Sequence, residues 1–303
     1  MLTVFSELYA RIYNHQPPDR VCIGESQADI LSQGRGFMDG FDYTMQLMVG
    51  CPGGCAFCYV KTGYMLAPAA VKGPQGSLWG SVLRHKKDPI GKLHAHLRKG
   101  TLANKTLYWS GVTDPYASAP KITRGIWETL CVIPPEMRPK RIAVQSRFRP
   151  DRDAEIIAQY AGQTHPSDGG PAVVFSYSMG TDRNDLISAW ERATPSFEQR
   201  MSCVTRLREA GLFVVVTLSP FALWNDLQGT LQQFKALGVA YVTVLFFKCG
   251  TKSANTPTQF RQFIEKEYPQ LLDVAWQQDR VDEVQSVFGP DRVIVGQEGF
   301  ISL

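Results

Sequence analysis

Three cysteines lie within eight consecutive positions of this 303-residue chain. Cys51, Cys55 and Cys58 form a CxxxCxxC pattern that includes Gly53 and Gly54, and the chain holds seven cysteines in all. This spacing is too tight for a disulfide framework and favours reduced thiols that bind metal. Three thiolates on a glycine-rich loop can wrap a cubane of iron and sulfide, because glycine gives the backbone the freedom to do so.

The number of thiols indicates a reactive centre. A [4Fe–4S] cluster normally takes four protein ligands, so three cysteines leave one iron open for chemistry. A zinc site would need a fourth Cys or His at finger spacing, and no CxxC or HxxxH partner lies near the loop. The pattern therefore predicts an iron–sulfur cluster that takes part in a reaction, and it disfavours a protein that only shuttles electrons.

Six nearly continuous apolar runs after residue 40 must position this loop. Such runs are typical of strands buried on both faces, and helical patterns separate them, several closed by Gly211 or Gly238. The repeated strand–helix plan predicts an α/β fold, a partial (β/α)6 barrel with the site on the loops after the strands. The predicted strands are residues 43–49, 106–111, 141–145, 172–177, 213–218 and 241–247.

The ends of the chain are predicted to be extensions of this core. We divide the chain into an N-terminal extension (1–40), the barrel core (41–250) and a C-terminal helical extension (251–303), whose last apolar run, Val293–Val295, packs against one barrel edge. No apolar run reaches the roughly 18 residues of a membrane span, and Glu7 interrupts the N-terminal apolar stretch. We therefore expect a soluble cytoplasmic protein with no membrane segment and no signal peptide.

With these features the chain resembles the radical S-adenosylmethionine (SAM) superfamily. The hallmark of that superfamily is this cysteine spacing with an aromatic residue before the last cysteine, here Phe57, and the resemblance covers roughly residues 41–247. It implies a [4Fe–4S] cluster on Cys51, Cys55 and Cys58, with SAM chelating the open iron and an external electron donor. It also implies that an electron from the cluster cleaves SAM to a 5′-deoxyadenosyl radical, which abstracts hydrogen from the substrate.

The resemblance makes polar residues at two strand ends candidates for SAM binding. Thr113 and Asp114, with Ser110, follow the second predicted strand, where the SAM ammonium group needs acceptors. Ser176 and Ser178 end the fourth, where hydroxyls can bond the ribose or carboxylate. Structural alternatives stay open, because an Asp-Pro pair can simply turn the chain and buried serines can be satisfied by backbone.

More closely, the chain is similar to the spore photoproduct lyase branch of the superfamily. By that similarity, Glu191 and Arg200 lie near the cofactor or brace the barrel, and the chemistry is the making or breaking of carbon–carbon bonds. The chain departs from that lyase in two respects: it has no cysteine in the stretch where the lyase has its hydrogen-donating thiol, and no certain counterpart of its tyrosine pair. The matching pieces are Trp79-Gly80, Thr113-Asp114-Pro115-Tyr116 with Thr123-Arg124, and the series Glu191, Pro195, Arg200 and Gly211.

Cys249 is the candidate catalytic residue among the other cysteines. It follows the sixth predicted strand, on the rim where catalytic groups gather, and the adjacent Lys248 would favour its thiolate. A role in radical quenching or substrate contact would suit this position. Cys131 and Cys203 fall within predicted amphipathic helices and are expected to be small core residues.

The charge of the chain is unevenly distributed. The segment from Ser81 to Arg152 holds 15 basic and 5 acidic residues, whereas the rest is net acidic and the total is +4. One basic surface is expected, suited to an anionic partner, although an ordinary solvated surface would have the same composition. Two substrates follow: a ribosomally made peptide, recognised with a small partner protein that docks on the basic segment, or DNA, whose phosphates the segment would follow. The scattered cations and the absence of a DNA-docking motif favour the peptide.

Overall fold

Eight strands form one open sheet in this computed structural model, which describes residues 2–63, 67–117, 119–249, 255–296 and 299. The order across the sheet is β11-β10-β9-β8-β7-β6-β3-β2, and all neighbouring strands are parallel except β2 and β3. The strands are β2 (Leu31–Gln33), β3 (Tyr43–Met45), β6 (Thr106–Trp109), β7 (Arg141–Ser146), β8 (Val173–Ser178), β9 (Phe213–Leu218), β10 (Tyr241–Val244) and β11 (Val293–Val295).

The parallel strands confirm the α/β class predicted from the apolar runs. Each of the six predicted runs contributes a strand to this sheet, and β8 is buried along its whole length, as expected of a strand covered on both faces. The final apolar run also behaves as expected, because β11 pairs with β10 at the edge of the sheet.

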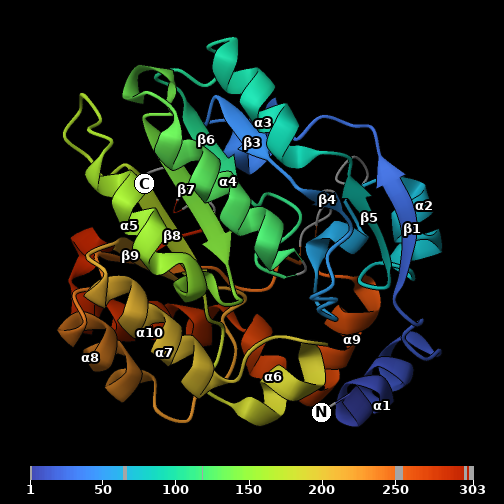
Figure 1. Cartoon of the computed structure of the whole chain (residues 1–303). Helices are drawn as coiled ribbons and strands as arrows, with labels where there is room; N and C mark the ends of the chain where they lie inside the picture. The colour runs from blue at the N-terminus through green and yellow to red at the C-terminus, as the bar shows by residue number, and fades with distance from the viewer. Residues whose placement is uncertain (1, 64–66, 118, 250–254, 297–298, 300–303) are drawn as a thin grey trace.

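Helices cover one face of the sheet (Figure 1) and enclose the main apolar core with it. Ser196 Oγ accepts from the backbone N–H of Gln199 in a capping box that starts α7, and the left-handed Gly211 and Gly238 follow α7 and α8 as predicted. No helix among the described residues is long and apolar enough to cross a bilayer. The covering helices are α3 (Pro89–Arg98), α4 (Pro120–Val132), α5 (Ala154–Gly162), α7 (Phe197–Glu209), α8 (Leu227–Ala236) and α10 (Val274–Phe288).

The first predicted strand, 43–49, is divided between two sheets. β3 stays in the large sheet, whereas β4 (Met48–Val49) joins a three-stranded sheet of order β1-β5-β4, formed with β1 (Val21–Ser26) and β5 (Val82–Lys86). The N–H of Gln46, between the two, donates to the Ile30 carbonyl oxygen (2.9 Å). Residues on both sides of this break are buried, so the apolar run continues although the strand does not.

Helices from near both ends of the described chain meet beside the cysteine-rich loop. α1 (Leu2–Tyr13), α6 (Asn184–Trp190) and α9 (Thr258–Glu267) share an apolar cluster with Ala56 and Phe57 of that loop. α1 and α9 lie side by side at one end of the molecule (Figure 1). The remaining short helices are α2 (Ala69–Lys72), η1 (Gly36–Met38), η2 (Tyr59–Lys61), η3 (Pro74–Gly76), η4 (Pro135–Met137), η5 (Pro150–Asp153), η6 (Pro269–Leu272) and η7 (Pro290–Arg292).

The cations of the basic segment 81–152 come from different parts of the fold, and a single basic surface stays a prediction. Arg141 begins β7 and Arg147 follows its other end, so these two cations lie at opposite ends of the sheet. Arg138 is buried, and Lys86 donates to the Asp29 carbonyl oxygen. Because strands and helices alternate along this segment, cations that are close in sequence can lie at different ends of the sheet. A count of charges along the chain does not show this.

Candidate functional site

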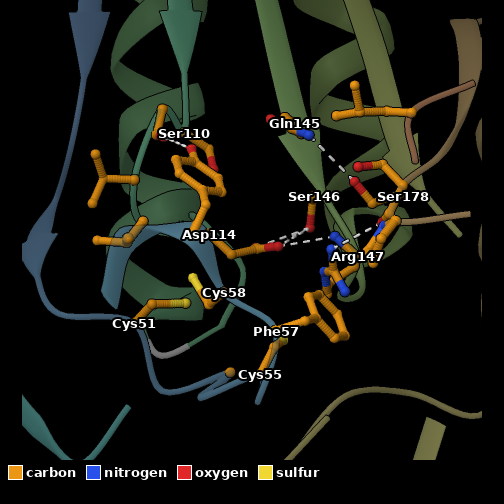
Figure 2. Close-up of a pocket in the computed structure, with 18 of the residues that line it drawn as sticks. Cys51, Cys55, Phe57, Cys58, Ser110, Asp114, Gln145, Ser146, Arg147 and Ser178 are labelled. Carbon is orange, nitrogen blue, oxygen red and sulfur yellow. Dashed lines mark hydrogen bonds between the residues drawn. The ribbon is translucent and has the colours of Figure 1, made fainter. Parts of the chain in front are cut away.

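A pocket opens at the carboxyl ends of the parallel strands, with the cysteine-rich loop on one side (Figure 2). We call residues 51–59 the cysteine loop; Cys51, Gly53, Cys55, Phe57, Cys58 and Tyr59 line the pocket from it. The opposite side, which we call the strand-end wall, comes from residues just after or at the ends of β6, β7 and β8. Its polar members are Ser110, Asp114, Gln145, Ser146, Arg147 and Ser178.

The backbone of the cysteine loop is anchored from behind by other parts of the chain. The N–H of Ala56 donates to the Trp190 carbonyl oxygen (2.8 Å), and Tyr13 Oη donates to the Ala56 carbonyl oxygen (2.5 Å). Arg20 donates to the Pro52 carbonyl oxygen (2.5 Å). Because contacts to backbone atoms hold the loop, its cysteine side chains remain available for a ligand.

The Trp79-Gly80 pair packs directly against the cysteine loop. A Cβ on Gly80 would lie 2.4 Å from Gly54 Cα, and both glycines have positive φ, so the two backbones can approach only without side chains. Trp79 is buried and has no oxygen or nitrogen acceptor for its indole N–H among the described residues. Burial raises the pKa of the Cys58 thiol, and the indole N–H, which acts on the Cys58 sulfur, partly offsets that rise. Gly80 thus allows the close approach of the two backbones, and Trp79 directs a polar N–H at a loop sulfur.

The three loop cysteines are free thiols in a desolvated setting. Burial raises the pKa of Cys51 to about 11 and raises the pKa values of Cys55 and Cys58 as well, although Arg147 partly offsets the rise at Cys55. The thiols therefore keep their protons at neutral pH until a metal replaces them.

The three loop cysteines suit a polynuclear group better than a single metal ion. No set of three or more His, Cys, Asp or Glu side chains in the described ranges converges as the ligands of one metal ion. Thiolates that hold a cubane bind different iron atoms and need not converge on one point. The cysteine loop, with its buried indole N–H donor and the nearby guanidinium of Arg147, fits a negatively charged iron–sulfur cluster.

Asp114 is held in place by three donors of the chain itself. Its carboxylate accepts from Tyr116 N (2.9 Å), Arg147 N (2.9 Å) and Ser146 Oγ (2.9 and 3.1 Å). Burial raises the pKa of Asp114 to about 6, even though these hydrogen bonds favour the ionised form. The contact with Tyr116 is the turn expected of an Asp-Pro pair, and the carboxylate also lines the pocket; a role as SAM acceptor stays a prediction.

Arg147, which sequence reasoning missed, is the cation of the strand-end wall. Its guanidinium donates to Glu191 Oε1 (3.0 Å) and the Ser219 carbonyl oxygen (3.3 Å), and it lies 5.3 Å from the centre of the Phe57 ring. Burial alone would lower its pKa, but Glu191 and Cys55 hold the pKa above its usual value. A fixed, permanently charged guanidinium on a pocket wall suits an anionic ligand group.

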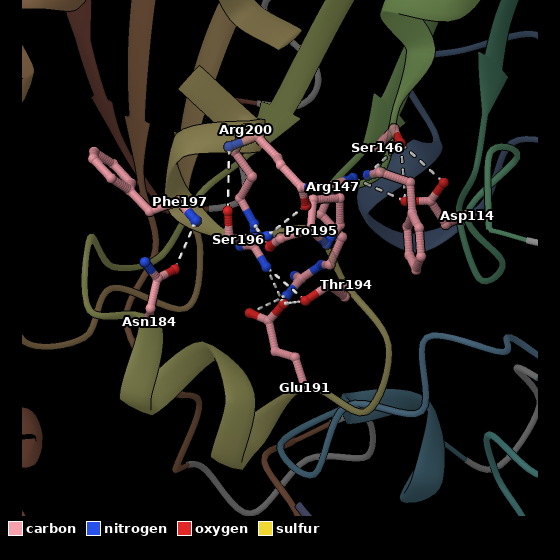
Figure 3. A network of polar contacts seen from close by, with 12 residues as sticks. Asp114, Ser146, Arg147, Asn184, Glu191, Thr194, Pro195, Ser196, Phe197 and Arg200 are labelled. Carbon is pink, nitrogen blue, oxygen red and sulfur yellow. Dashed lines mark hydrogen bonds and ion pairs between the residues drawn. The ribbon is translucent and has the colours of Figure 1, made fainter. Parts of the chain in front are cut away.

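Glu191 and Arg200 brace this arginine from outside the pocket (Figure 3). Glu191 bridges Arg147 and Arg200, and Thr194 Oγ1 donates to its second oxygen (2.5 Å). Burial would raise the pKa of Glu191, but the two guanidiniums hold it below the usual value. Of the two roles that the resemblance offered these residues, their contacts correspond to the bracing role.

The remaining candidates from the sequence divide into two groups. Ser110, Ser178 and Phe57 line the pocket; Ser110 has a positive φ (99°), and Gln145 donates to Ser178 Oγ (3.4 Å). Thr113 and Ser176 do not line it. Thr113 Oγ1 donates to the Gly50 carbonyl oxygen (3.1 Å), and Ser176 Oγ bonds Thr217 Oγ1 (2.7 Å) inside the sheet, so a side chain and not the backbone satisfies this buried serine.

Cys249 lies on the rim after β10, beside the pocket residues Phe247 and Lys248 but outside the pocket lining. Partial burial raises the pKa of its thiol, and the main charges that act on it are Arg261 and Glu265. The expectation that Lys248 favours the thiolate is therefore wrong, because the lysine ammonium lies over the Tyr59 ring instead (5.8 Å).

Two pocket residues besides Arg147, Gln145 and Tyr59, also escaped the sequence reasoning, although a signal for them existed. Gln145 lies near the end of a buried strand and Arg147 directly follows that strand, at the kind of position that singled out Asp114 and Ser178. Tyr59 directly follows the last loop cysteine, and its Oη donates to the Gly111 carbonyl oxygen (2.6 Å). The rule applied to the second and fourth strands would have found the third-strand residues as well.

Comparison with known proteins identifies the fold. No protein-family model and no curated protein matches the chain. Among solved structures, a mutant of spore photoproduct lyase matches with a TM-score of 0.55 at 14% identity, covering 95% of this chain and 84% of that chain. A mutant of the same enzyme with bound AdoMet and dinucleoside spore photoproduct matches with a TM-score of 0.54 at 16% identity, with the same coverage.

A second kind of neighbour has a similar core. A radical S-adenosylmethionine methyltransferase from Kitasatospora setae matches with a TM-score of 0.50 at 13% identity, covering 82% of this chain and 52% of that chain. At sequence identities this low, the matches show a shared fold and no more. The chain therefore has the partial-barrel fold of radical SAM enzymes, in the form found in spore photoproduct lyase.

Proposed function

We propose that this chain, which has the partial barrel of the radical SAM enzymes, is itself a radical SAM enzyme. The observation that carries the proposal is the meeting of three free, half-buried thiols, from one loop, with fixed polar groups from three strand ends around a single pocket. In this proposal Cys51, Cys55 and Cys58 hold a [4Fe–4S] cluster and SAM occupies the rest of the pocket. When bound, the cluster supplies the electron that cleaves SAM to the 5′-deoxyadenosyl radical.

The residues of the strand-end wall would orient SAM. Arg147 offers its guanidinium to the SAM carboxylate, and its contact with Glu191 fixes its direction. Asp114 and Ser178 offer acceptors for the ammonium and ribose groups. Phe57 and Phe247 pack edge to face (6.2 Å between ring centres) and give the pocket an apolar side that excludes water.

Anaerobic reconstitution with iron and sulfide tests this proposal. We expect about four irons per chain, a visible thiolate-to-iron absorption band, and 5′-deoxyadenosine production from SAM with dithionite. Replacing Cys51, Cys55 or Cys58 by Ala should abolish the band and the production, whereas Cys22→Ala, at an exposed position on β1, should change neither. Full SAM cleavage by Cys55→Ala would contradict the proposal.

For the substrate we propose a ribosomally made peptide that undergoes carbon–carbon bond cleavage or rearrangement. Cations of segment 81–152 lie at both ends of the sheet and several are paired with carboxylates, as Arg141 is with Asp168 and Arg124 with Asp153, so part of the positive charge is neutralised within the protein and is less available to duplex phosphates. A small recognition protein and an external one-electron donor would complete the system. DNA repair of the spore photoproduct lyase kind is the alternative, because two matching structures are of that enzyme.

Stimulation of 5′-deoxyadenosine formation distinguishes the substrates. The reconstituted enzyme is incubated with SAM and dithionite, and either with peptides encoded beside its gene or with an oligonucleotide that contains spore photoproduct. We expect the peptide to raise turnover and to change in mass. Binding of duplex oligonucleotide together with repair of the lesion, and no effect of the peptides on turnover, would reject the peptide and support the alternative.

A further inference from the structure

Lys61 is a buried cation directly behind the cysteine loop. It ends η2, three residues after Cys58, and is only 4% exposed. Its ammonium lies 4.3 Å from the centre of the Tyr13 ring and 4.7 Å from that of Tyr9, both on α1. Within the described part of the chain, its Nζ has no hydrogen-bond acceptor and no carboxylate partner.

A charge in this position is unusual, because a buried ammonium normally has a carboxylate partner. Two tyrosine faces supply part of the missing solvation by cation–π attraction. Burial lowers the pKa of Lys61 to about 8, so the side chain still carries its charge at neutral pH. The groups that act on its charge are the loop cysteines Cys58 and Cys55, which become anionic thiolates when they bind a metal.

The other cations near the loop either have a carboxylate partner or, like Arg20 and Lys248, are partly exposed, so that solvent screens their charge. Arg147 faces the same cysteines from the pocket side, but Glu191 balances its charge. Arg20 acts on Cys51 and is engaged with the Pro52 carbonyl oxygen. Lys61 therefore stands out as an uncompensated positive charge close to two of the proposed cluster ligands, held in an environment of low dielectric where its field is weakly screened.

We propose that Lys61, caged by Tyr9 and Tyr13, raises the reduction potential of the cluster held by the cysteine loop. The inference rests on the proposed function. Reduction adds one electron from an external one-electron donor to the cluster, with no bond made or broken, so the cluster becomes more negative by one charge. A fixed ammonium stabilises that more negative state more than the oxidised state. The N-terminal helix α1 then has a defined task, because its tyrosines keep water away from the charge.

Lys61 is a positioning residue, and a purely structural role is the competing explanation. In that case the lysine would only join α1 to the loop through its contacts with the two rings. The explanations differ in one measurable quantity, since a structural anchor affects unfolding whereas a tuning charge shifts the potential of a correctly folded, fully loaded protein.

The test is an anaerobic redox titration of the reconstituted protein, followed by electron paramagnetic resonance of the reduced cluster. In Lys61→Met we expect the ratio of reduced to oxidised cluster at a fixed potential to fall about tenfold, equivalent to a midpoint about 59 mV more negative. Lys61→Arg should stay near the native value. The control is Lys92→Met, which removes a lysine on α3 bound to the carbonyl oxygens of Gln27 and Ala28 and should leave the potential unchanged.

Iron content separates failure of this inference from failure of the proposed function. A Lys61→Met protein with full iron content and an unshifted midpoint would overturn the inference and leave the cluster assignment intact. If Lys61→Met does not retain iron, Tyr9→Ala provides the second measurement: it keeps the charge but admits water, and a smaller negative shift is expected. An unchanged midpoint in that variant, with full iron content, would likewise overturn the role of the cage.

Discussion

The two sides of the pocket are built in opposite ways. The cysteine loop is one short stretch of chain whose backbone is tied down by Tyr13, Arg20 and Trp190, while its sulfurs are left free. The strand-end wall comes from three separate strands, and its polar side chains bond mainly to one another, as Asp114 does to Ser146. The difference suggests a division of labour: the loop is arranged to receive a metal group, and the wall is arranged to hold a fixed polar surface.

Glu191→Gln should have the largest effect on the strand-end wall. It leaves the guanidiniums of Arg147 and Arg200 without their shared anion, and removing one partner of a buried pair costs about 3–5 kcal/mol. Chemical unfolding of the apoprotein at pH 7 measures this loss. Glu198→Gln, on the exposed start of α7, is the matched control and should change stability little. An equal loss of iron binding in the well-folded Glu191→Gln protein would break the proposed division of labour.

The same variant predicts a dependence on pH. The folded-state pKa of Glu191 lies below its ordinary value of 4.5, so its stabilisation is fully present above that value and is lost as pH falls through the lower folded-state pKa. The difference in unfolding free energy between the native protein and Glu191→Gln should therefore be constant from pH 5 upward and shrink below about 4.5. A difference that stayed constant down to acidic pH would show that the charge of Glu191 is not what stabilises the brace.

Arg147→Met should weaken SAM binding without removing the cluster. Loss of one charge-assisted hydrogen bond costs about 1.5–3 kcal/mol, which raises the dissociation constant roughly 10- to 100-fold. Equilibrium binding of SAM to reconstituted protein measures it, with iron content determined in parallel. Arg152→Met, an exposed arginine after the same strand, should bind SAM normally. Loss of iron in Arg147→Met would mean that the wall also contributes to holding the metal.

Asp114→Ala should give a similar but smaller change. The cluster should be retained and the SAM dissociation constant should rise about tenfold, near the lower end of the range for a charge-assisted hydrogen bond, because three donors of the chain already engage the carboxylate. Ser146→Ala removes one of those donors and serves as the comparison. An unchanged dissociation constant in Asp114→Ala would reduce this residue to a turn former.

Thr113→Val should have the smallest effect and none on SAM. Its hydroxyl donates to the Gly50 carbonyl oxygen just before the cysteine loop, and losing such a bond typically lowers stability by about 0.5–1.5 kcal/mol. Unfolding and SAM binding are measured on the same preparation. A clear rise in the SAM dissociation constant would place Thr113 among the cofactor-binding residues after all, as the sequence proposed.

Much of the fold could be predicted because buried parallel strands carry a strong local signal. Each of the six apolar runs contains a strand, and the final run at Val293–Val295 forms the predicted edge. The small sheet could not be predicted in the same way. β1 is largely exposed and contains Gly24, so it lacks a buried apolar pattern, and β4 merges with β3 in one apolar run. A run of apolar residues looks the same in the sequence whether its two halves are buried in two sheets or in one.

The sequence by itself determined the chemistry of the cysteine loop. Three thiols with two glycines between them are close in space wherever the chain folds, because the ligand spacing is local. The sequence also placed Asp114 and Ser178 at or after the ends of strands, because the apolar runs predict where the strands lie.

Only the tertiary structure decided which polar residues share the pocket and which support it from outside. Arg147 becomes the cation of the wall through Glu191, which is 44 residues away, and Arg200 is buried behind both. Lys61 is caged only because α1, which lies about fifty residues earlier in the chain, packs Tyr9 and Tyr13 against its ammonium group. Such contacts join segments far apart in the chain, and their energies depend on burial, which no local pattern of residues contains.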